Sequence, residues 1–304
     1  MRILFMGTPD IAAECLKALY AAGHDICAVY TRRDKPVGRK QVLTAPPVKE
    51  VALAHGTPVF QPRTLRDGSE DENIRALAPE LIVVVAYGRI LPKDILNVPP
   101  LGCVNVHASL LPKYRGSAPI NWAMLNGDTE TGVSIMYMAE ELDAGDVILT
   151  AKTPIDPEED LPSLWDRLAK VGAEALAEAL PLLAAGTAPR TPQDSTQATF
   201  APMLSRELSP IDWTKPVAAI RNQVRGLIPW PCATAELTGQ RFKIYKTAVG
   251  TATDKTPGTL LSAGKKGIEV ACGDGQSLWI TELQAEGGKR MSAAAYLLGH
   301  PMHI

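Results

Sequence analysis

Leu81-Ile82-Val83-Val84-Val85-Ala86 is the most apolar run in the chain and gives its strongest fold signal. Six consecutive aliphatic residues, three of them valine, are typical of a strand buried on both faces at the centre of a parallel sheet. Around this run, strand-like and helix-like segments alternate through the first two-thirds of the chain. The sequence therefore predicts an α/β fold with a Rossmann-like, mostly parallel sheet that has helices on both faces.

Shorter segments on both sides of this run continue the alternation. Strands are expected at residues 3–6, 26–31, 58–61, 103–107, 133–138 and 147–151, and helices at residues 9–22, 47–55, 118–126 and 161–185. After residue 186 the pattern dissolves, and short β-like runs then follow between glycine-containing turns. We therefore predict an α/β domain at residues 1–188, a linker at 189–205 and a small C-terminal β-barrel (OB-like) domain at 206–304.

The composition is that of an ordinary globular protein, and only the charge distribution stands out. Of the 304 residues, 46% are apolar and 21% are charged, with a net charge of −2. Residues 206–304 hold 12 Lys and Arg against 8 Asp and Glu, so the net charge of this part is +4. A basic C-terminal third favours a polyanionic partner, and chance asymmetry is the alternative.

The cysteines and the first residues indicate the compartment. Five scattered cysteines form no CxxC pair and no zinc-type spacing with histidine, so we expect reduced thiols and no metal site. The first apolar run, Met1–Met6, is too short for a signal peptide, and no apolar stretch reaches 18 residues. We therefore expect a cytoplasmic protein.

The first turn between strand and helix, Gly7-Thr8-Pro9, argues against a dinucleotide site. It lacks the GxGxxG pattern, and the second strand ends in Thr31-Arg32-Arg33 without the acidic residue that would bind a ribose. The sequence contains no P-loop. A nucleotide-dependent oxidoreductase is therefore disfavoured.

The strand at residues 103–107 ends in two polar side chains, Asn105 and His107, which period-two alternation places on one face. Ligands of a parallel sheet collect at this carboxyl edge. The Asn105 amide and a protonated His107 can each donate a hydrogen bond to an oxygen that gains negative charge. A downstream carboxylate can orient the imidazole. Asp143 is preferred over Asp146 for this role, because Gly145 and Asp146 resemble the turn before the next strand.

Two stretches around these residues resemble the signature segments of the folate-dependent formyltransferases. The first begins Asn105-Val106-His107-Ala108-Ser109-Leu110-Leu111-Pro112, and the second is Leu142-Asp143-Ala144-Gly145-Asp146. This resemblance implies that Asn105, His107 and Asp143 are catalytic. It also implies that Ser109, Leu110, Leu111 and Pro112 line the folate site, and that 10-formyltetrahydrofolate donates the formyl group without a metal.

A basic loop makes the chain similar to those members of the family that act on methionyl-tRNA. The loop reads Thr31-Arg32-Arg33-Asp34-Lys35-Pro36-Val37-Gly38-Arg39-Lys40-Gln41. In those members the matching loop enters the acceptor stem, which implies tRNA-binding roles for Arg32, Arg33, Lys35, Arg39 and Lys40. Basic side chains in such a loop contact phosphates and supply affinity with little sequence information. A solvated surface loop is the alternative.

The resemblance implies formyl transfer from 10-formyltetrahydrofolate to the α-amino group of methionyl-initiator tRNA, which supports translation initiation. An amino-sugar nucleotide formyltransferase would share the three catalytic residues and a similar barrel, but it would not need the basic loop. A glycinamide ribonucleotide formyltransferase would not need the C-terminal domain. A non-catalytic tRNA-binding module would use only the loop and the barrel.

Overall fold

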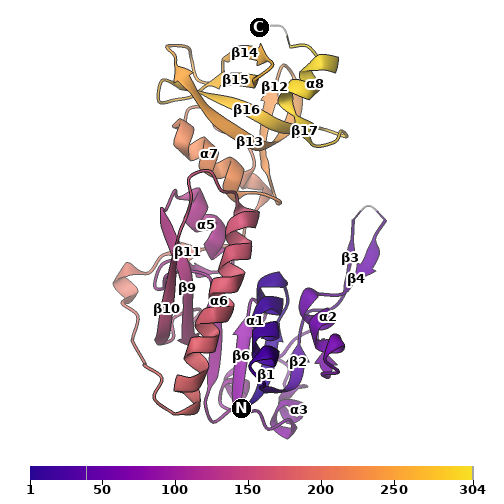
Figure 1. Cartoon of the computed structure of the whole chain (residues 1–304), viewed down its shortest axis with the longest axis vertical. Coiled ribbons are helices and arrows are strands. Elements are labelled where there is room, and N and C mark those ends of the chain that lie inside the picture. The colour runs from indigo at the N-terminus through magenta and orange to yellow at the C-terminus, as the bar shows by residue number, and fades with distance from the viewer. Residues whose placement is uncertain (39, 303–304) are drawn as a thin grey trace. The chain divides into compact units, whose positions relative to one another are not determined.

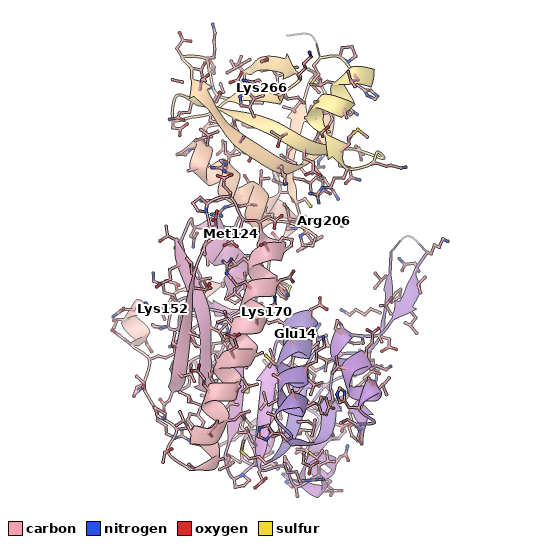
Figure 2. The ribbon with its side chains drawn as sticks, viewed as in Figure 1. Glu14, Met124, Lys152, Lys170, Arg206 and Lys266 are labelled. Carbon is pink, nitrogen blue, oxygen red and sulfur yellow. The ribbon has the colours of Figure 1, made fainter. Side chains whose placement is uncertain are left out.

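The computed structural model describes residues 1–38 and 40–302, which divide into two compact units (Figure 1). The first unit comprises Met1–Pro119, Glu130–Pro154 and Trp165–Ala201. The second comprises Ile120–Thr129, Ile155–Leu164 and the chain from Pro202 onward. Exposed lysines mark the surface of each unit, Lys152 and Lys170 in the first and Lys266 in the second (Figure 2).

A mostly parallel sheet forms the centre of the first unit, in the order β10-β9-β7-β6-β1-β2-β5. The strands are β1 Arg2–Gly7, β2 Asp25–Tyr30, β5 Val59–Phe60, β6 Leu81–Val85, β7 Cys103–His107, β9 Glu130–Tyr137 and β10 Val147–Pro154. Strands β1, β2, β5, β6 and β7 run parallel, whereas β9 is antiparallel to both β7 and β10. All five residues of β6 are buried, as the apolar run predicts.

Helices cover both faces of this sheet because its strands present apolar side chains to each face. The helices of the chain are α1 Asp10–Ala21, α2 Pro47–Ala54, α3 Asp71–Ala76, α4 Lys93–Leu96, α5 Pro119–Leu125, α6 Leu161–Ala184, α7 Val217–Gly226 and α8 Ala293–Gly299. On one face, a core that includes Met6, Ile82 and Val84 packs with Ile74 of α3 and Ile95 of α4. On the other face, α1 and α6 lie side by side (Figure 1).

The second unit contains an antiparallel sheet in the order β12-β13-β16-β15-β14, with β17 paired to β16. Its strands are β12 Ala233–Leu237, β13 Gln240–Ala252, β14 Leu260–Gly264, β15 Gly267–Ala271, β16 Gln276–Ala285 and β17 Met291–Ser292. Phe242, Ile244, Ile268 and Ile280 form the centre of its core. The predicted fold class, a mostly parallel α/β sheet followed by a C-terminal antiparallel β domain, is confirmed.

Two segments contain more structure than the sequence pattern predicts. The basic loop forms a hairpin of β3, Lys35–Val37, with β4, Val42–Thr44. In the expected linker, Phe200–Ala201 forms β11 and pairs with β8, Arg115–Gly116. None of the helices in the described part of the chain combines the length and apolarity needed to cross a membrane.

Candidate active site

Strand β7 positions the two polar residues that the sequence analysis selects. Cys103 packs in the core on the α3 and α4 face, so alternation turns Asn105 and His107 to the same face. Val106 points to the opposite face, where it lies beside Gly172 of α6. Since β7 is paired with β6 on one side and β9 on the other, the backbone under both polar side chains is fixed.

The structure brings Asp143 to these two residues. Asn105 Nδ2 lies 3.5 Å from Asp143 Oδ1, and His107 Nδ1 lies 3.8 Å from Asp143 Oδ2. Only 6% of the His107 side chain and 11% of the Asp143 side chain are exposed. Asp146 lies elsewhere, with its Oδ2 3.8 Å from Arg190 Nη1. Both contacts to Asp143 exceed an ordinary hydrogen-bond length, so each donor can still serve another acceptor.

A backbone contact fixes which nitrogen of His107 faces the site. His107 Nε2 lies 2.9 Å from the carbonyl oxygen of Tyr114. Because a carbonyl only accepts, Nε2 carries a proton and donates it. The neutral ring therefore holds its lone pair on Nδ1, the nitrogen that faces Asp143. When the ring is protonated, the new N–H group is at Nδ1 and faces the Asp143 carboxylate.

The loop that carries Asp143 is held by residues that sequence reasoning missed. Gln193 Nε2 donates to the carbonyl oxygens of Asp143, at 2.9 Å, and Gly145, at 2.8 Å. Gln193 Oε1 in turn accepts from Nε and Nη2 of Arg115, a residue that is 2% exposed. The Gly116 N–H donates to Asp143 Oδ2 at 2.8 Å. Gly145 is required here because a Cβ atom would overlap the carbonyl oxygen of Tyr137.

Comparison with family models and known proteins identifies this arrangement. Residues 1–180 match the formyl transferase domain, and residues 203–301 match the formyl transferase C-terminal domain. The methionyl-tRNA formyltransferase of Trichlorobacter lovleyi is 52% identical over 303 residues, which cover 100% of this chain and 95% of the relative. The chain belongs to the methionyl-tRNA formyltransferase family.

Solved structures of more distant proteins share the fold. HypX from Aquifex aeolicus in complex with tetrahydrofolic acid superposes with a TM-score of 0.67 at 19% identity, covering 98% of this chain and 47% of HypX. The N-formyltransferase of Helicobacter canadensis, in complex with folinic acid and dTDP-3-aminofucose, gives a TM-score of 0.65 at 18% identity, covering 91% of this chain and 97% of that enzyme. At these identities the likeness concerns the fold.

The segment expected to line the folate site of this family member follows β7 directly. Ser109 is fully buried, and its hydroxyl donates to the carbonyl oxygen of Lys113 at 2.7 Å. Ser134 of β9 accepts from the Leu111 N–H at 3.1 Å and donates to the Ser109 carbonyl oxygen at 2.7 Å. Leu110, Leu111 and Pro112 are partly exposed. The Ser109 hydroxyl is thus used within the turn, and the three residues after it offer apolar surface beside the site.

The described residues that are expected to bind tRNA differ in their surroundings. Arg32 and Arg33, before β3, donate to the carbonyl oxygens of Gly88 and Gln61. Lys35 of β3 and Lys40 in the turn are exposed. Arg39 lies outside the described residues.

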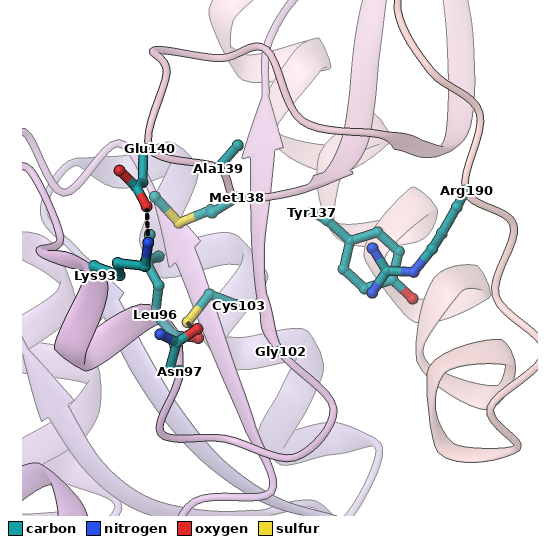
Figure 3. Close-up of a pocket in the computed structure, with 10 residues that line it drawn as sticks. All are labelled: Lys93, Leu96, Asn97, Gly102, Cys103, Tyr137, Met138, Ala139, Glu140 and Arg190. Carbon is teal, nitrogen blue, oxygen red and sulfur yellow. Dashed lines mark hydrogen bonds and ion pairs between the residues drawn. The ribbon is translucent and has the colours of Figure 1, made fainter.

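A pocket of about 300 Å³ lies at the amino end of β7, and none of the three catalytic candidates lines it (Figure 3). It surrounds Cys103 at the start of β7, with a Lys93–Glu140 ion pair of 2.9 Å on one side. On another side the Arg190 guanidinium lies 3.6 Å from the centre of the Tyr137 ring. Burial raises the pKa of the Cys103 thiol to about 12, so this thiol stays protonated and is a poor nucleophile.

No group of three or more His, Cys, Asp and Glu side chains in residues 1–38 and 40–302 is placed to hold a metal ion. All five cysteines are free and buried. The polar groups available for chemistry at the end of β7 are therefore an amide, an imidazole and a carboxylate.

Proposed function

We propose that this formyltransferase transfers the formyl group of 10-formyltetrahydrofolate to the α-amino group of methionyl-initiator tRNA. The observation that carries the proposal is the convergence of Asn105 Nδ2 and His107 Nδ1 on Asp143, at the carboxyl end of a buried strand. The family membership agrees with it. We assign the α/β domain to residues 1–188, the linker to 189–205 and the tRNA-binding domain to 206–304.

The two donors fit a reaction in which charge develops on a carbonyl oxygen. 10-Formyltetrahydrofolate supplies an activated formyl group, and attack by the amine moves negative charge onto the formyl oxygen. Asn105 donates one amide N–H to that oxygen, and protonated His107 donates its Nδ1–H. A well-placed donor of this kind contributes roughly 3–4 kcal/mol to the stability of the transition state. Asp143 holds both donors in position and accepts the proton that the amine loses. The bond between the formyl carbon and N10 then breaks, N10 takes up one proton, and tetrahydrofolate leaves.

Acceptor recognition is assigned to exposed basic side chains in each unit. In the first unit these are Lys35 and Lys40 of the hairpin. In the second unit Arg241, Lys243 and Lys246 are exposed along β13. Such side chains neutralise phosphates, so binding should weaken steeply as salt is added. The five buried thiols fit a reducing compartment, and we place the reaction in the cytoplasm.

A formylation assay with purified full-length chain tests the proposal. We expect formylation of methionyl-initiator tRNA with 10-formyltetrahydrofolate, at a higher kcat/KM than for methionyl-elongator tRNA. A UDP-linked amino sugar serves as the competing acceptor, because solved sugar formyltransferases share the fold. Formylation of the amino sugar, with no reaction on either tRNA, would refute the proposed acceptor.

A further inference from the structure

One residue of the expected linker, Thr199, lies beside the turn that supplies the backbone partner of His107. That partner is Tyr114, whose carbonyl oxygen lies 2.9 Å from His107 Nε2. Thr199 Oγ1 accepts a hydrogen bond from the Tyr114 N–H at 2.9 Å, although the two residues are 85 positions apart in the chain. The Thr199 carbonyl oxygen accepts another from the Arg115 N–H, also at 2.9 Å. Thr199 therefore bonds the chain on both sides of Tyr114.

These two hydrogen bonds fix both backbone dihedrals of Tyr114. The Tyr114 N–H belongs to the peptide group before its Cα atom, and the Arg115 N–H belongs to the peptide group after it. In a planar trans peptide the N–H and C=O groups point in opposite directions. Because the Arg115 N–H points at Thr199, the carbonyl of the same peptide group, which is that of Tyr114, points away from Thr199 and toward His107.

Tyr114 needs such restraints because its backbone conformation is unfavourable. Its φ is +61°, in the left-handed region that bulky side chains rarely occupy. A conformation of this kind persists only where the surrounding structure holds it. Burial of Tyr114, which is 7% exposed, and the hydrogen bonds to Thr199 both contribute here. Loss of the Thr199 hydroxyl would remove one restraint and let the Tyr114 carbonyl turn away from His107.

The Tyr114 carbonyl decides which nitrogen of the neutral His107 ring carries the proton. A neutral imidazole has one N–H group, and an acceptor faces each nitrogen of His107. The Tyr114 carbonyl oxygen is 2.9 Å from Nε2, whereas Asp143 Oδ2 is 3.8 Å from Nδ1, so the shorter contact favours the proton on Nε2. If the carbonyl withdraws, the proton can move to Nδ1 and donate to Asp143. That bond would occupy the nitrogen that we assign to the formyl oxygen.

We propose that Thr199 is a positioning residue for formyl transfer, an inference that rests on the proposed function. Its hydroxyl holds Tyr114, and the Tyr114 carbonyl holds His107 with Nδ1 toward the reacting group. Thr199 is exposed, so replacing its side chain removes a hydrogen bond without opening a cavity in the core. The pairing of β11 with β8 uses backbone atoms and does not depend on the Thr199 side chain. The role can therefore be tested in a folded chain.

Substitutions at Thr199 test this role in the full-length chain. Thr199→Val removes the hydroxyl at nearly constant volume, and kcat for formylation of methionyl-tRNA should fall roughly three- to tenfold, as for the loss of one hydrogen bond. The KM values for methionyl-tRNA and for 10-formyltetrahydrofolate should not change. Thr199→Ser keeps the hydroxyl and should keep the wild-type kcat. Thr196→Val is the matched control, because the Thr196 hydroxyl is in the same segment but bonds Asp194 within a local turn. Thermal unfolding checks that each variant is folded.

Nuclear magnetic resonance of the chain, labelled with heavy nitrogen at its histidines, measures the linkage without any substrate. At alkaline pH, where the ring is neutral, His107 should carry its proton on Nε2 in wild type, Thr199→Ser and Thr196→Val. In Thr199→Val a large share of the molecules should carry it on Nδ1, and the spectrum of His107→Gln assigns the signals by their absence.

The two measurements together decide the role. A His107 proton that stays on Nε2 in Thr199→Val, a wild-type kcat in that variant, or an equal fall of kcat in Thr196→Val would each refute the positioning role. Failure of the proposed function is seen separately, in a wild-type chain that does not formylate methionyl-tRNA. That result would overturn the role of Thr199 in formyl transfer as well, whereas the position of the proton would still report whether Thr199 holds His107.

Discussion

The loop around Asp143 and the hairpin of β3 and β4 both project from the first unit, but they are held in opposite ways. Gln193 and the backbone of Gly116 bond the Asp143 loop, and these bonds fix a carboxylate that is almost fully buried. The hairpin strands are exposed along their whole length, including Val42 at 59% and Leu43 at 67%. Formyl transfer needs donors fixed before the substrate arrives, whereas a phosphate backbone is bound by accessible charge. Changes in the loop should therefore lower kcat, and changes in the hairpin should weaken acceptor binding.

The largest expected effect is at Asn105 and Asp143. Asn105→Ala removes one hydrogen bond to the formyl oxygen, and Asp143→Asn keeps the shape of the loop but removes its charge. Each should lower kcat by a factor on the order of 10² or more and leave folate binding nearly intact. Single-turnover formylation and a donor-binding titration measure the two quantities separately. Near-wild-type turnover in either variant would remove that residue from the mechanism.

Support for the Asp143 loop should matter nearly as much. Gln193→Ala removes two hydrogen bonds to loop carbonyls and leaves buried Arg115 without its main acceptor. Small displacements of a catalytic group are costly, so kcat should fall by roughly one to two orders of magnitude while the KM for tRNA changes little. Gln197→Ala, in which only a contact to exposed Asp194 is lost, is the control. An unchanged kcat in Gln193→Ala would mean that the loop holds its position without this clamp.

Gln193 also shows which site residues cannot be predicted from the sequence. Period-two alternation predicts that Asn105 and His107 share one face, and the turn pattern around Gly145 favours Asp143 over Asp146. In the structure Asp143 lies beside both side chains, and Asp146 lies beside Arg190. Gln193 carries no local signal, because its partners lie 48 to 78 residues away in the chain. It falls in a polar stretch that predicts a linker. Long-range hydrogen bonds of one polar side chain leave no periodic trace in the sequence.

The secondary structure shows the same limit of prediction from sequence. Strands β6 and β7 were predicted within one residue because burial on both faces, or alternation, marks them clearly. The hydrophobic pattern reveals neither α3, in which Ile74 is the one buried residue, nor the β3–β4 hairpin, whose strands have none. Elements held by backbone pairing without burial escape a method based on hydrophobic pattern.

Between β3 and β4, Arg39→Ala should lower kcat/KM for methionyl-tRNA about tenfold. The cause is a higher KM, since one charged phosphate contact is lost. Unfolding temperature should not change, because the strands β3 and β4 on either side of this position are exposed and bury no core residue. Arg66→Ala, at an exposed arginine elsewhere in the first unit, is the control. If Arg39→Ala formylates as well as its parent at several salt concentrations, the hairpin does not recognise the acceptor.

The smallest expected effect is at the base of the hairpin, where Asp34 accepts hydrogen bonds from Gln61 at 2.8 Å and from Lys49 at 2.8 and 2.9 Å. Hydrogen bonds from Gln61 and Lys49 lower the pKa of the Asp34 carboxyl below its ordinary value of 3.8. A lowered pKa in the folded chain means that the anchor stabilises the hairpin base above pH 3.8 and is lost as the pH falls through the lowered value. Asp34→Asn should therefore increase hydrogen exchange in β3 and β4 modestly at pH 7.

At low pH, hydrogen exchange in the hairpin should be the same in wild type and in Asp34→Asn. As the pH falls below the lowered pKa, protonation gives the wild-type Asp34 the same neutral charge as asparagine, and the difference in hairpin exchange, after correction for the intrinsic rate at each pH, should vanish. Asp67→Asn is the matched control, because the Asp67 pKa is also lowered but its partner, Ser69, belongs to a local turn. That variant should leave exchange in β3 and β4 at the wild-type rate at every pH. A difference between Asp34→Asn and wild type that persists in acid would show that the asparagine alters the hairpin base by its shape, and that the carboxylate charge is not the anchor.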